Sequence, residues 1–387
     1  MASSTTRMRD SAAFEIEETS TDNGYEVTIS KTKCWKYSSV PVGASPPALT
    51  GINGSAEGER MNLTLRIFCA LLDRQTIYYP ILAVFAVPVN LLTIVILSRG
   101  KCGLSKCVTR SLVAMAAADL LVVIIDLILK KIPTLYDVWI VVVYYVKVCN
   151  FHAVLLYAAT DCSVWFTVAF TFDRYVAVSC QKLKTKYCTD RTAAVVLGTV
   201  TVLSCLKNTF WYFMFTGRYN PFNLPFLCDT SEAYGSSRVF AAIEFLHHIL
   251  TPFVPCVLIL LLNAFTVRHI SVASRVRRRL RGQTIGENAS DPEMESRRKS
   301  IILLYLISAN FILFWAVFLV YSVWRGVWYL GLGSIPPYNF VQELGFMLQL
   351  LSCCTNTCIY AVTQNKFREQ FKNMMKYPFT LIVKFSN

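Results

Sequence analysis

Apolar residues gather into seven long runs along the chain. The runs are Ile77–Ser98, Thr109–Leu129, Val148–Val178, Thr192–Phe215, Val239–Ile270, Ser300–Trp324 and Phe340–Thr363. Each is long enough to cross the hydrocarbon core of a membrane, which takes about 20 helical residues. One such run could be a buried helix of a soluble core, but seven leave too little polar sequence to cover them. The pattern predicts an all-α membrane protein, a seven-transmembrane helix bundle.

The segments on either side of the runs predict two further parts. Residues 1–75 begin with a polar stretch that lacks periodicity, and we expect a disordered extracellular tail. Because no signal-peptide pattern precedes it, the first span is expected to act as the signal anchor. Residues 76–363 make up the transmembrane domain. Residues 364–387 predict a short amphipathic eighth helix, with Phe367 and Phe371 toward lipid, and a short cytoplasmic tail.

Charge orients the predicted bundle. The net charge of +14 could indicate nucleic-acid binding, but 22 of the 38 Lys and Arg residues lie in alternate connections and the last segment. These segments are Arg99–Arg110, Gln181–Arg191, Arg268–Lys299 and Gln364–Asn387. Since positive loops favour the cytoplasm, we expect a plasma-membrane protein with its N-terminus outside, its C-terminus inside and no nucleic-acid partner. Two glycosylation triplets, at Asn53 and Asn62, then lie on the outer side.

Most of the 14 cysteines lie within the spans or on the inner side, where they behave as small apolar residues. Three outer candidates differ. Cys149 starts the third span and Cys228 precedes the fifth, so a bridge between them would tie that loop to the third helix. Cys34 could be free or could pair with Cys69.

Charged residues inside the spans are costly and therefore candidates for function. Asp119 follows ten residues of the second run, at a depth of roughly 15 Å for a rise of 1.5 Å per residue. Three polar residues of other spans are its candidate partners: Asn90, Ser163 and Asn356. Lys207 and Glu244 are instead expected to extend toward a membrane surface.

Asp173-Arg174-Tyr175 lies at the inner end of the third span. The adjacent acid neutralises the arginine in one state. Release of the guanidinium would allow it to contact another helix or a partner, which is a switch in physical terms.

Further motifs accompany this triplet in a fixed order. They are Pro88-Val-Asn-Leu-Leu, Leu112-Val-Ala-Met-Ala-Ala-Ala-Asp119-Leu, Cys149 before Arg174, Pro255, Phe311 with Trp315, Asn356-Thr-Cys-Ile-Tyr360 and Lys366-Phe-Arg-Glu-Gln-Phe371. From about residue 75 to 376 the chain resembles the rhodopsin-like G-protein-coupled receptors. The resemblance implies a receptor, not an enzyme, that binds an extracellular ligand and activates a heterotrimeric G protein.

Three stretches, 98–107, 155–174 and 291–300, resemble a smaller group of orphan-type receptors. That resemblance implies coupling mainly to the Gq class and phospholipase C. It also implies sensitivity to aromatic amino acids or small peptides.

The sequence departs from the family pattern at several positions. Thr357 replaces the usual proline of the span-seven motif, and Val317 replaces a kinking proline in span six. The fourth span lacks its usual central tryptophan. Since a lost proline restores a backbone donor and removes a helix break, we expect straighter sixth and seventh spans.

The ligand site is expected between the outer halves of spans three, five, six and seven. Leu156 stands where amine receptors carry an aspartate, and Leu350 where opsins carry the retinal lysine, so neither ligand is expected. The expected lining residues are Tyr157, Thr160, Asp161, His247, His248, Trp315, Phe318, Phe346 and Gln349. Such a wall suits an aromatic amino acid or a peptide side chain, although each ring could instead pack between helices. At most one of the adjacent histidines is expected to face the centre.

Asp119, Asn90, Ser163 and Asn356 resemble the family's sodium pocket. A sodium ion there would offset the carboxylate charge and favour the inactive state. No other metal and no other cofactor are expected.

The inner side carries the expected G-protein surface, which includes Asn356 and Tyr360 of the switch. Arg297 stands where many relatives carry an acid that pairs with the switch arginine. The inner lock is therefore expected to be weak or absent, with high basal signalling as the result. The same basic residues also suit the anionic inner face of the bilayer, the lipid partner of this surface.

Two other classes of membrane protein predict features that this sequence lacks. A transporter predicts internal repeats and broken helices, and the sequence has no repeat and only isolated prolines. An intramembrane enzyme needs a metal cluster or a nucleophile with its base, and no such motif is present.

Overall fold

The structure, a computed structural model, describes residues 18–21, 24–27, 56–136, 146–219, 225–230, 238–281, 292–329, 331, 333, 335 and 337–374. Within these residues, seven helical segments are long and apolar enough to cross a membrane, so the predicted fold class is confirmed. They are built from α2 (Ala56–Ser98); α3 (Lys106–Val122), η1 (Val123–Lys131) and α4 (Ile132–Tyr136); α5 (Val146–Ser179); α7 (Asp190–Asn208) and η3 (Thr209–Phe213); α9 (Arg238–His248), η4 (Ile249–Phe253) and α10 (Val254–Arg281); α11 (Pro292–Tyr329); and α12 (Asn339–Thr363).

The chain divides into two compact units, residues 1–75 with 338–340 and residues 76–337 with 341–387. In the first unit, β1 (Glu18–Thr21) pairs antiparallel with β2 (Gly24–Val27). Helix α2 begins at Ala56, well before the predicted first run. Both features lie in residues 1–75, for which the sequence predicts a disordered tail. The strands were not predicted, because four residues are too few for a periodicity to show.

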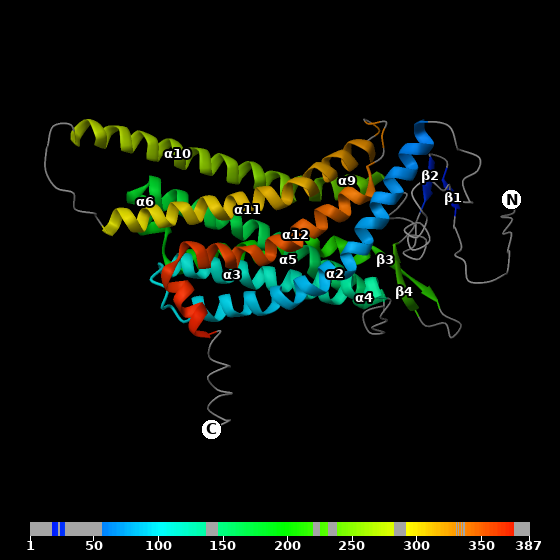
Figure 1. Ribbon diagram of the computed structural model, residues 1–387, viewed down its shortest axis with the longest axis horizontal. Helices are drawn as coiled ribbons and strands as arrows, with labels where there is room; N and C mark the ends of the chain where they lie inside the picture. The colour runs from blue at the N-terminus through cyan, green and yellow to red at the C-terminus, as the bar shows by residue number, and fades with distance from the viewer. Residues whose placement is uncertain are drawn as a thin grey trace, which may run out of the picture. The chain divides into compact units, whose positions relative to one another are not determined.

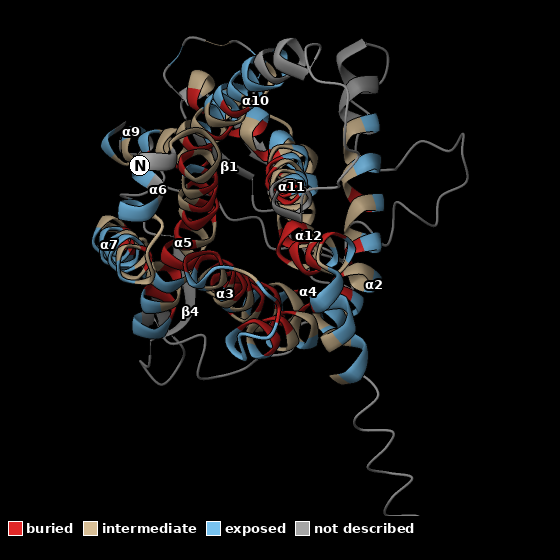
Figure 2. Cartoon of the chain, turned by 90° about the vertical axis from the view of Figure 1, so that its left-hand side faces the viewer, coloured by how far each residue is buried: buried red, intermediate tan, exposed pale blue. Residues whose placement is uncertain are grey.

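Helices α3 and α5 lie at the centre of the second unit. The most apolar windows of the spans that contain them are 56% buried, against 17% for the span that contains α7. Figure 2 shows this contrast, with buried residues along α3 and α5 and a largely exposed α7. Helix α5 is central because it contacts α3, α7, α10 and α11.

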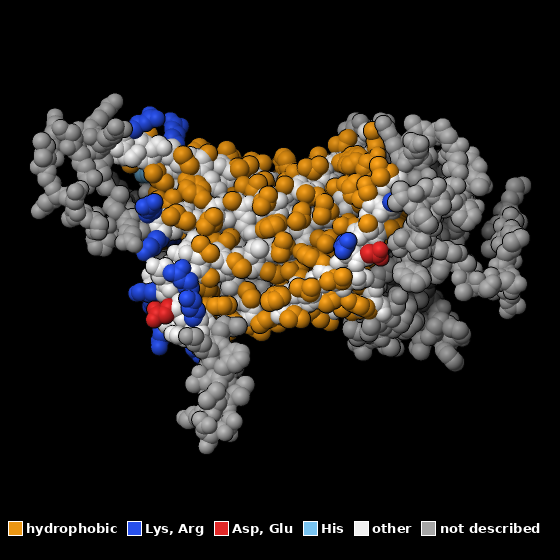
Figure 3. All heavy atoms as spheres, viewed as in Figure 1, with side chains coloured by type: hydrophobic (Ala, Val, Ile, Leu, Met, Phe, Trp, Pro, Cys, Tyr) orange, Lys and Arg blue, Asp and Glu red, His pale blue; other side chains and the backbone are white. Residues whose placement is uncertain are grey.

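One end of the second unit carries most of the Lys and Arg side chains visible in Figure 3, and we call it the basic end. Hydrophobic side chains cover the middle of the face in that view. Figure 1 shows the C-terminal end of α10 and the N-terminal end of α11 at the basic end, with α6 (Gln181–Tyr187) nearby. The β3 (Phe215–Tyr219) and β4 (Pro225–Thr230) hairpin lies toward the other end.

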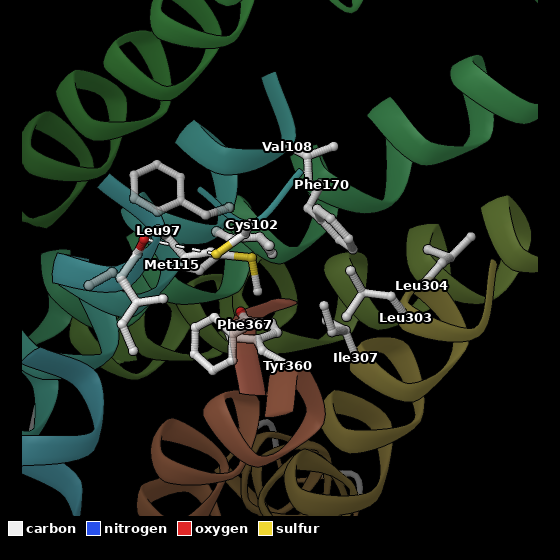
Figure 4. Packing of buried hydrophobic residues seen from close by; sticks show 14 of the residues in the cluster. Leu97, Cys102, Val108, Met115, Phe170, Leu303, Leu304, Ile307, Tyr360 and Phe367 are labelled. Carbon is white, nitrogen blue, oxygen red and sulfur yellow. Dashed lines mark hydrogen bonds between the residues drawn. The ribbon is translucent and has the colours of Figure 1, made fainter. Parts of the chain in front are cut away.

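A hydrophobic cluster fills the bundle beneath the basic end, and Figure 4 shows its side chains. Residues 365–374 are helical. Phe367 of this helix is fully buried, with its ring centroid 5.9 Å from that of Tyr360. The prediction that Phe367 faces lipid is therefore wrong, because the apolar face of this helix covers the end of the bundle. Burial raises the pKa of the Cys102 thiol in the same cluster, although Lys366 acts in the opposite direction.

The two positions that lack the family prolines lie within continuous helix. Helix α11 runs through Val317, and α12 runs through Thr357, whose hydroxyl lies 2.7 Å from that of Thr93. The fifth span, in contrast, is interrupted at Thr251, where φ is −152° and ψ is 104°. Thr251 precedes Pro252, and a residue before proline is disfavoured in the helical region.

Candidate functional site

Asp119 lies at the centre of a buried polar network. Ser163 Oγ donates to Asp119 Oδ1 at 2.5 Å, and Asn356 Nδ2 donates to Asp119 Oδ2 at 2.8 Å. The side chain of Asn310 continues the network, since its Nδ2 donates to Asn356 Oδ1 at 3.3 Å. Thr355 Oγ1 in turn donates to Asn310 Oδ1 at 2.6 Å. Helices α3, α5, α11 and α12 are thus joined by side chains at one level.

Asn310 was missed in the sequence analysis, although an amide beside Phe311 in an apolar run was a usable signal. Asn90 was expected at Asp119, but its Nδ2 donates to the backbone oxygens of Ala86 and Cys353, each at 3.0 Å. Asn90 Oδ1 is buried and has no hydrogen-bond partner among the described residues.

The donor atoms around Asp119 suit a hard cation. The carboxylate and the Ser163 hydroxyl both offer oxygen atoms, and hard cations prefer oxygen ligands. Among the described residues, Asp119 forms no ion pair, so its negative charge has no protein counter-ion. A sodium ion therefore fits the residues present.

Arg174 is held by its own neighbour. Its Nε donates to Asp173 Oδ2 at 3.0 Å, and its Nη2 contacts the same oxygen more closely. Arg174 Nη1 also donates to Ser300 Oγ of α11 at 3.2 Å. The thiol of Cys107 donates to Asp173 Oδ1 at 3.1 Å. Among the described side chains, the α11 partner of Arg174 is therefore a hydroxyl rather than a carboxylate.

Three further switch residues have different surroundings. The Tyr175 ring centroid lies 6.3 Å from that of Phe265 on α10. The Tyr360 hydroxyl is buried without a hydrogen-bond partner among the described residues. Arg297 lies near the start of α11, and its side chain is outside the described residues.

Six of the nine expected ligand-site residues form one aromatic cluster. The ring centroids of Tyr157 and His247 lie 5.1 Å apart, and those of His247 and His248 lie 5.5 Å apart. The His248 ring in turn lies 5.5 Å from that of Phe318. Phe318 then contacts Trp315 at 6.1 Å and Phe346 at 5.3 Å. Both histidine rings contact the cluster, because His247 faces α5 while His248 faces α11.

The other three expected residues lie outside this ring chain. Thr160 is half-buried on α5, and the buried Oε1 of Gln349 has no hydrogen-bond partner among the described residues. Asp161 is 1% exposed and faces α7, where Lys207 Nζ lies 2.6 Å from its Oδ2. Lys207 thus pairs with Asp161 instead of extending toward a membrane surface.

Two ion pairs flank the aromatic cluster. Glu244 of α9 pairs with Arg325 of α11 at 3.1 Å and with His248 at 3.7 Å, which also differs from the predicted extension of Glu244 to the surface. Lys131 of η1 pairs with Glu343 of α12 at 3.2 Å. Arg325 escaped the sequence analysis because it follows the last residue of the predicted sixth run.

Two of the predicted disulfide cysteines lie within the described side chains. Cys149 and Cys69 are both disulfide-bonded, and the side chain of Cys228 lies outside the described residues. The backbone of Cys228 pairs with Gly217 in the β3–β4 hairpin. Asn150 of α5 holds this hairpin, since its Oδ1 accepts from the Phe215 N–H at 3.0 Å.

The two glycosylation triplets and Cys34 were also predicted from the outer segment. Asn53 and Cys34 lie outside the described residues. Asn62 lies within α2, and its side chain is not described.

The bundle, its central polar network and the arginine at its basic end define a seven-helix receptor. The model of the 7-transmembrane receptor family (rhodopsin family) matches residues 89–360, which is more than half of the chain. The chain belongs to this family. It is therefore a multi-pass membrane receptor that signals through G proteins, and receptors of this family are not enzymes.

Proposed function

We propose that this receptor responds to an aromatic amino acid or a small peptide and couples to the Gq class of G proteins. The observation that carries the proposal is the aromatic cluster from Tyr157 to Phe346, with an ion pair on either side. Aromatic rings offer a ligand ring stacked and edge-on contacts, and the ion pairs offer charge to its polar ends. Tyr157 of this cluster lies toward the start of α5, whereas Arg174 lies near the end of the same helix.

The basic end is the proposed cytoplasmic end. The Lys and Arg side chains gathered there suit the anionic inner leaflet and the positive-inside rule. The ligand then reaches the aromatic cluster from outside, and the G protein contacts the end that carries Arg174. The Arg174–Ser300 contact is weaker than a second ion pair, which supports a receptor that signals without ligand.

Calcium release in transfected cells tests the proposal. L-tryptophan, L-phenylalanine and short peptides should raise calcium in cells that express the receptor. Cells that lack Gq-class α subunits should not respond. Trp315→Ala should abolish the response at equal surface expression, whereas the matched control Trp324→Ala, one residue from the paired Arg325, should retain Gq-dependent calcium release. No response of the wild-type receptor to any of these ligands would reject the ligand class.

Sodium is the proposed modulator of the same switch. A cation at Asp119 would hold the α3, α5, α11 and α12 network together and disfavour the active arrangement. The absence of a protein counter-ion at Asp119 among the described residues supports this proposal.

A further inference from the structure

The fourth span reaches the aromatic cluster through Trp211 of η3. The Trp211 ring stacks on Tyr157 at 4.5 Å with an interplanar angle of 21°. It also meets the His247 ring at 5.3 Å, nearly perpendicular at 86°. Trp211 is 2% exposed, so it lies behind these two rings. Because it contacts both at once, its orientation limits where Tyr157 and His247 can lie.

The orientation of Trp211 is set by the amide of Asn208. Trp211 Nε1 donates to Asn208 Oδ1 at 3.0 Å. The amide cannot turn over, since Asn208 Nδ2 donates to Asp161 Oδ2 at 2.5 Å and to the Ser204 carbonyl at 2.8 Å. An ionised carboxylate only accepts, so the NH₂ group must face Asp161 and the amide oxygen must face Trp211.

Lys207 holds the Asp161 carboxylate in place through an ion pair. Its ammonium lies 2.6 Å from Asp161 Oδ2 and donates to Thr251 Oγ1 at 3.2 Å. Thr251 is the residue at which the fifth span leaves helical geometry. One lysine on α7 therefore joins α5 to the interruption in the fifth span, close to the segment that carries His247.

We infer that Asp161, Lys207 and Asn208 are positioning residues of the ligand site, which act by fixing Trp211 behind Tyr157 and His247. They do not touch the ligand themselves. The inference rests on the proposed function only in that Tyr157 and His247 line the ligand site. The fourth span then contributes to the ligand site through a hydrogen-bond chain that runs from Asp161 through Asn208 to the Trp211 indole.

A ligand-free measurement tests the positioning directly. The receptor is labelled with 5-fluorotryptophan in nanodiscs, and the fluorine resonance of Trp211 is assigned as the one lost in Trp211→Phe. Asn208→Leu and Lys207→Met should both shift this resonance, whereas Lys207→Arg should leave it in place. Cys205→Ser, at an exposed position of the same helix, is the matched control. An unmoved Trp211 resonance in Asn208→Leu would overturn the inference.

Agonist potency supplies the second measurement, with L-tryptophan and L-phenylalanine as probes in the calcium assay. Asn208→Leu and Trp211→Phe should each raise the half-maximal concentration about five- to tenfold, as expected for a lost buried hydrogen bond, with little change in the maximal response. The double variant should be no weaker than the worse single variant, because both changes remove one contact. Additive losses would overturn the inference.

The two proposals fail in different ways. If the wild-type receptor responds to neither amino acid, the proposed ligand class is wrong. The fluorine resonance then decides the positioning role alone, since it needs no agonist.

Discussion

Two aspartates in this bundle are equally buried, yet their surroundings are opposite. Asp119 and Asp161 are each 1% exposed. Asp119 receives hydrogen bonds from the uncharged side chains of Ser163 and Asn356. Asp161 receives one from Asn208 and pairs with the ammonium of Lys207. One carboxylate therefore has its counter-ion built into the protein, and the other has none among the described residues.

The difference separates a structural charge from a regulated one. A buried charge without a counter-ion is costly, so Asp119 gains stability from a bound cation or from a proton. Asp161 already has a fixed partner, and ions in solution should leave it unaffected.

Lys207→Met should cause the largest loss of stability. The variant leaves Asp161 buried and unpaired, and a broken buried ion pair costs about 3–5 kcal/mol. Asp161→Asn should cost less, because Lys207 is 28% exposed and its ammonium can move toward solvent. Thermal unfolding of the purified receptor measures both, with Lys147→Met at an exposed position as the control. Equal stability of Lys207→Met and wild type would show that the pair contributes nothing.

Asn310→Leu should have the next largest effect, now in the network of Asp119. The change leaves the Asn356 amide oxygen without its observed partner, at a cost of about 1–3 kcal/mol for a buried polar group, and removes one of the two acceptors of the Thr355 hydroxyl. Unfolding temperature should fall, and basal inositol phosphate production should change because α11 and α12 lose a direct link. An unchanged unfolding temperature together with unchanged basal signalling would contradict this role of Asn310.

Sodium should stabilise the receptor through Asp119 and not through Asp161. Exchange of choline chloride for sodium chloride should raise the free energy of unfolding by about 1.4 kcal/mol when sodium is at ten times its Kd. Asp119→Asn should abolish this increment, and Asp161→Asn should retain it. The comparison breaks if the increment survives in Asp119→Asn or disappears in Asp161→Asn.

Ser300→Ala should have the smallest effect. It concerns a third carboxylate, that of Asp173, which pairs with Arg174. Asp173 shares Arg174 with the Ser300 hydroxyl, so the variant removes one hydrogen bond, worth about 1 kcal/mol. Basal signalling should rise about fivefold, which is that free energy expressed as a population ratio. Inositol phosphate accumulation at matched expression measures it, with Ser274→Ala on the exposed face of α10 as the control. A basal signal equal to wild type would show that Ser300 does not restrain Arg174.

The two aspartates also show how far sequence reasoning reaches. Asp119 and two of its three predicted partners, Ser163 and Asn356, follow from polar residues at matching depths in apolar runs. Asp161 was assigned to the ligand wall from helical periodicity along α5. Periodicity gives the face of a helix, but the inward face of a central helix has several neighbours. Only the packing shows that Asp161 faces α7 and not the aromatic cluster.

The aromatic cluster follows the same division. Tyr157 was predictable from the helical period outward from Arg174, and His247, Trp315 and Phe318 were predictable as ring-bearing residues of the fifth and sixth spans. Trp211 was not, since its role depends on the hydrogen bond to Asn208 and on the stack against a different helix. Lys207 was also missed, because a lysine near a helix end has an ordinary explanation at the membrane surface.

By itself, the sequence determined the seven spans, their all-helical class and the family, because long apolar runs and ordered motifs are local properties. The tertiary structure alone decided which buried charge has a partner. Lys207 and Asp161 are 46 residues apart, and nothing local in the sequence brings an ammonium within 2.6 Å of a carboxylate. That distance depends on how α5 and α7 pack, and it separates a structural aspartate from one that remains open to a cation.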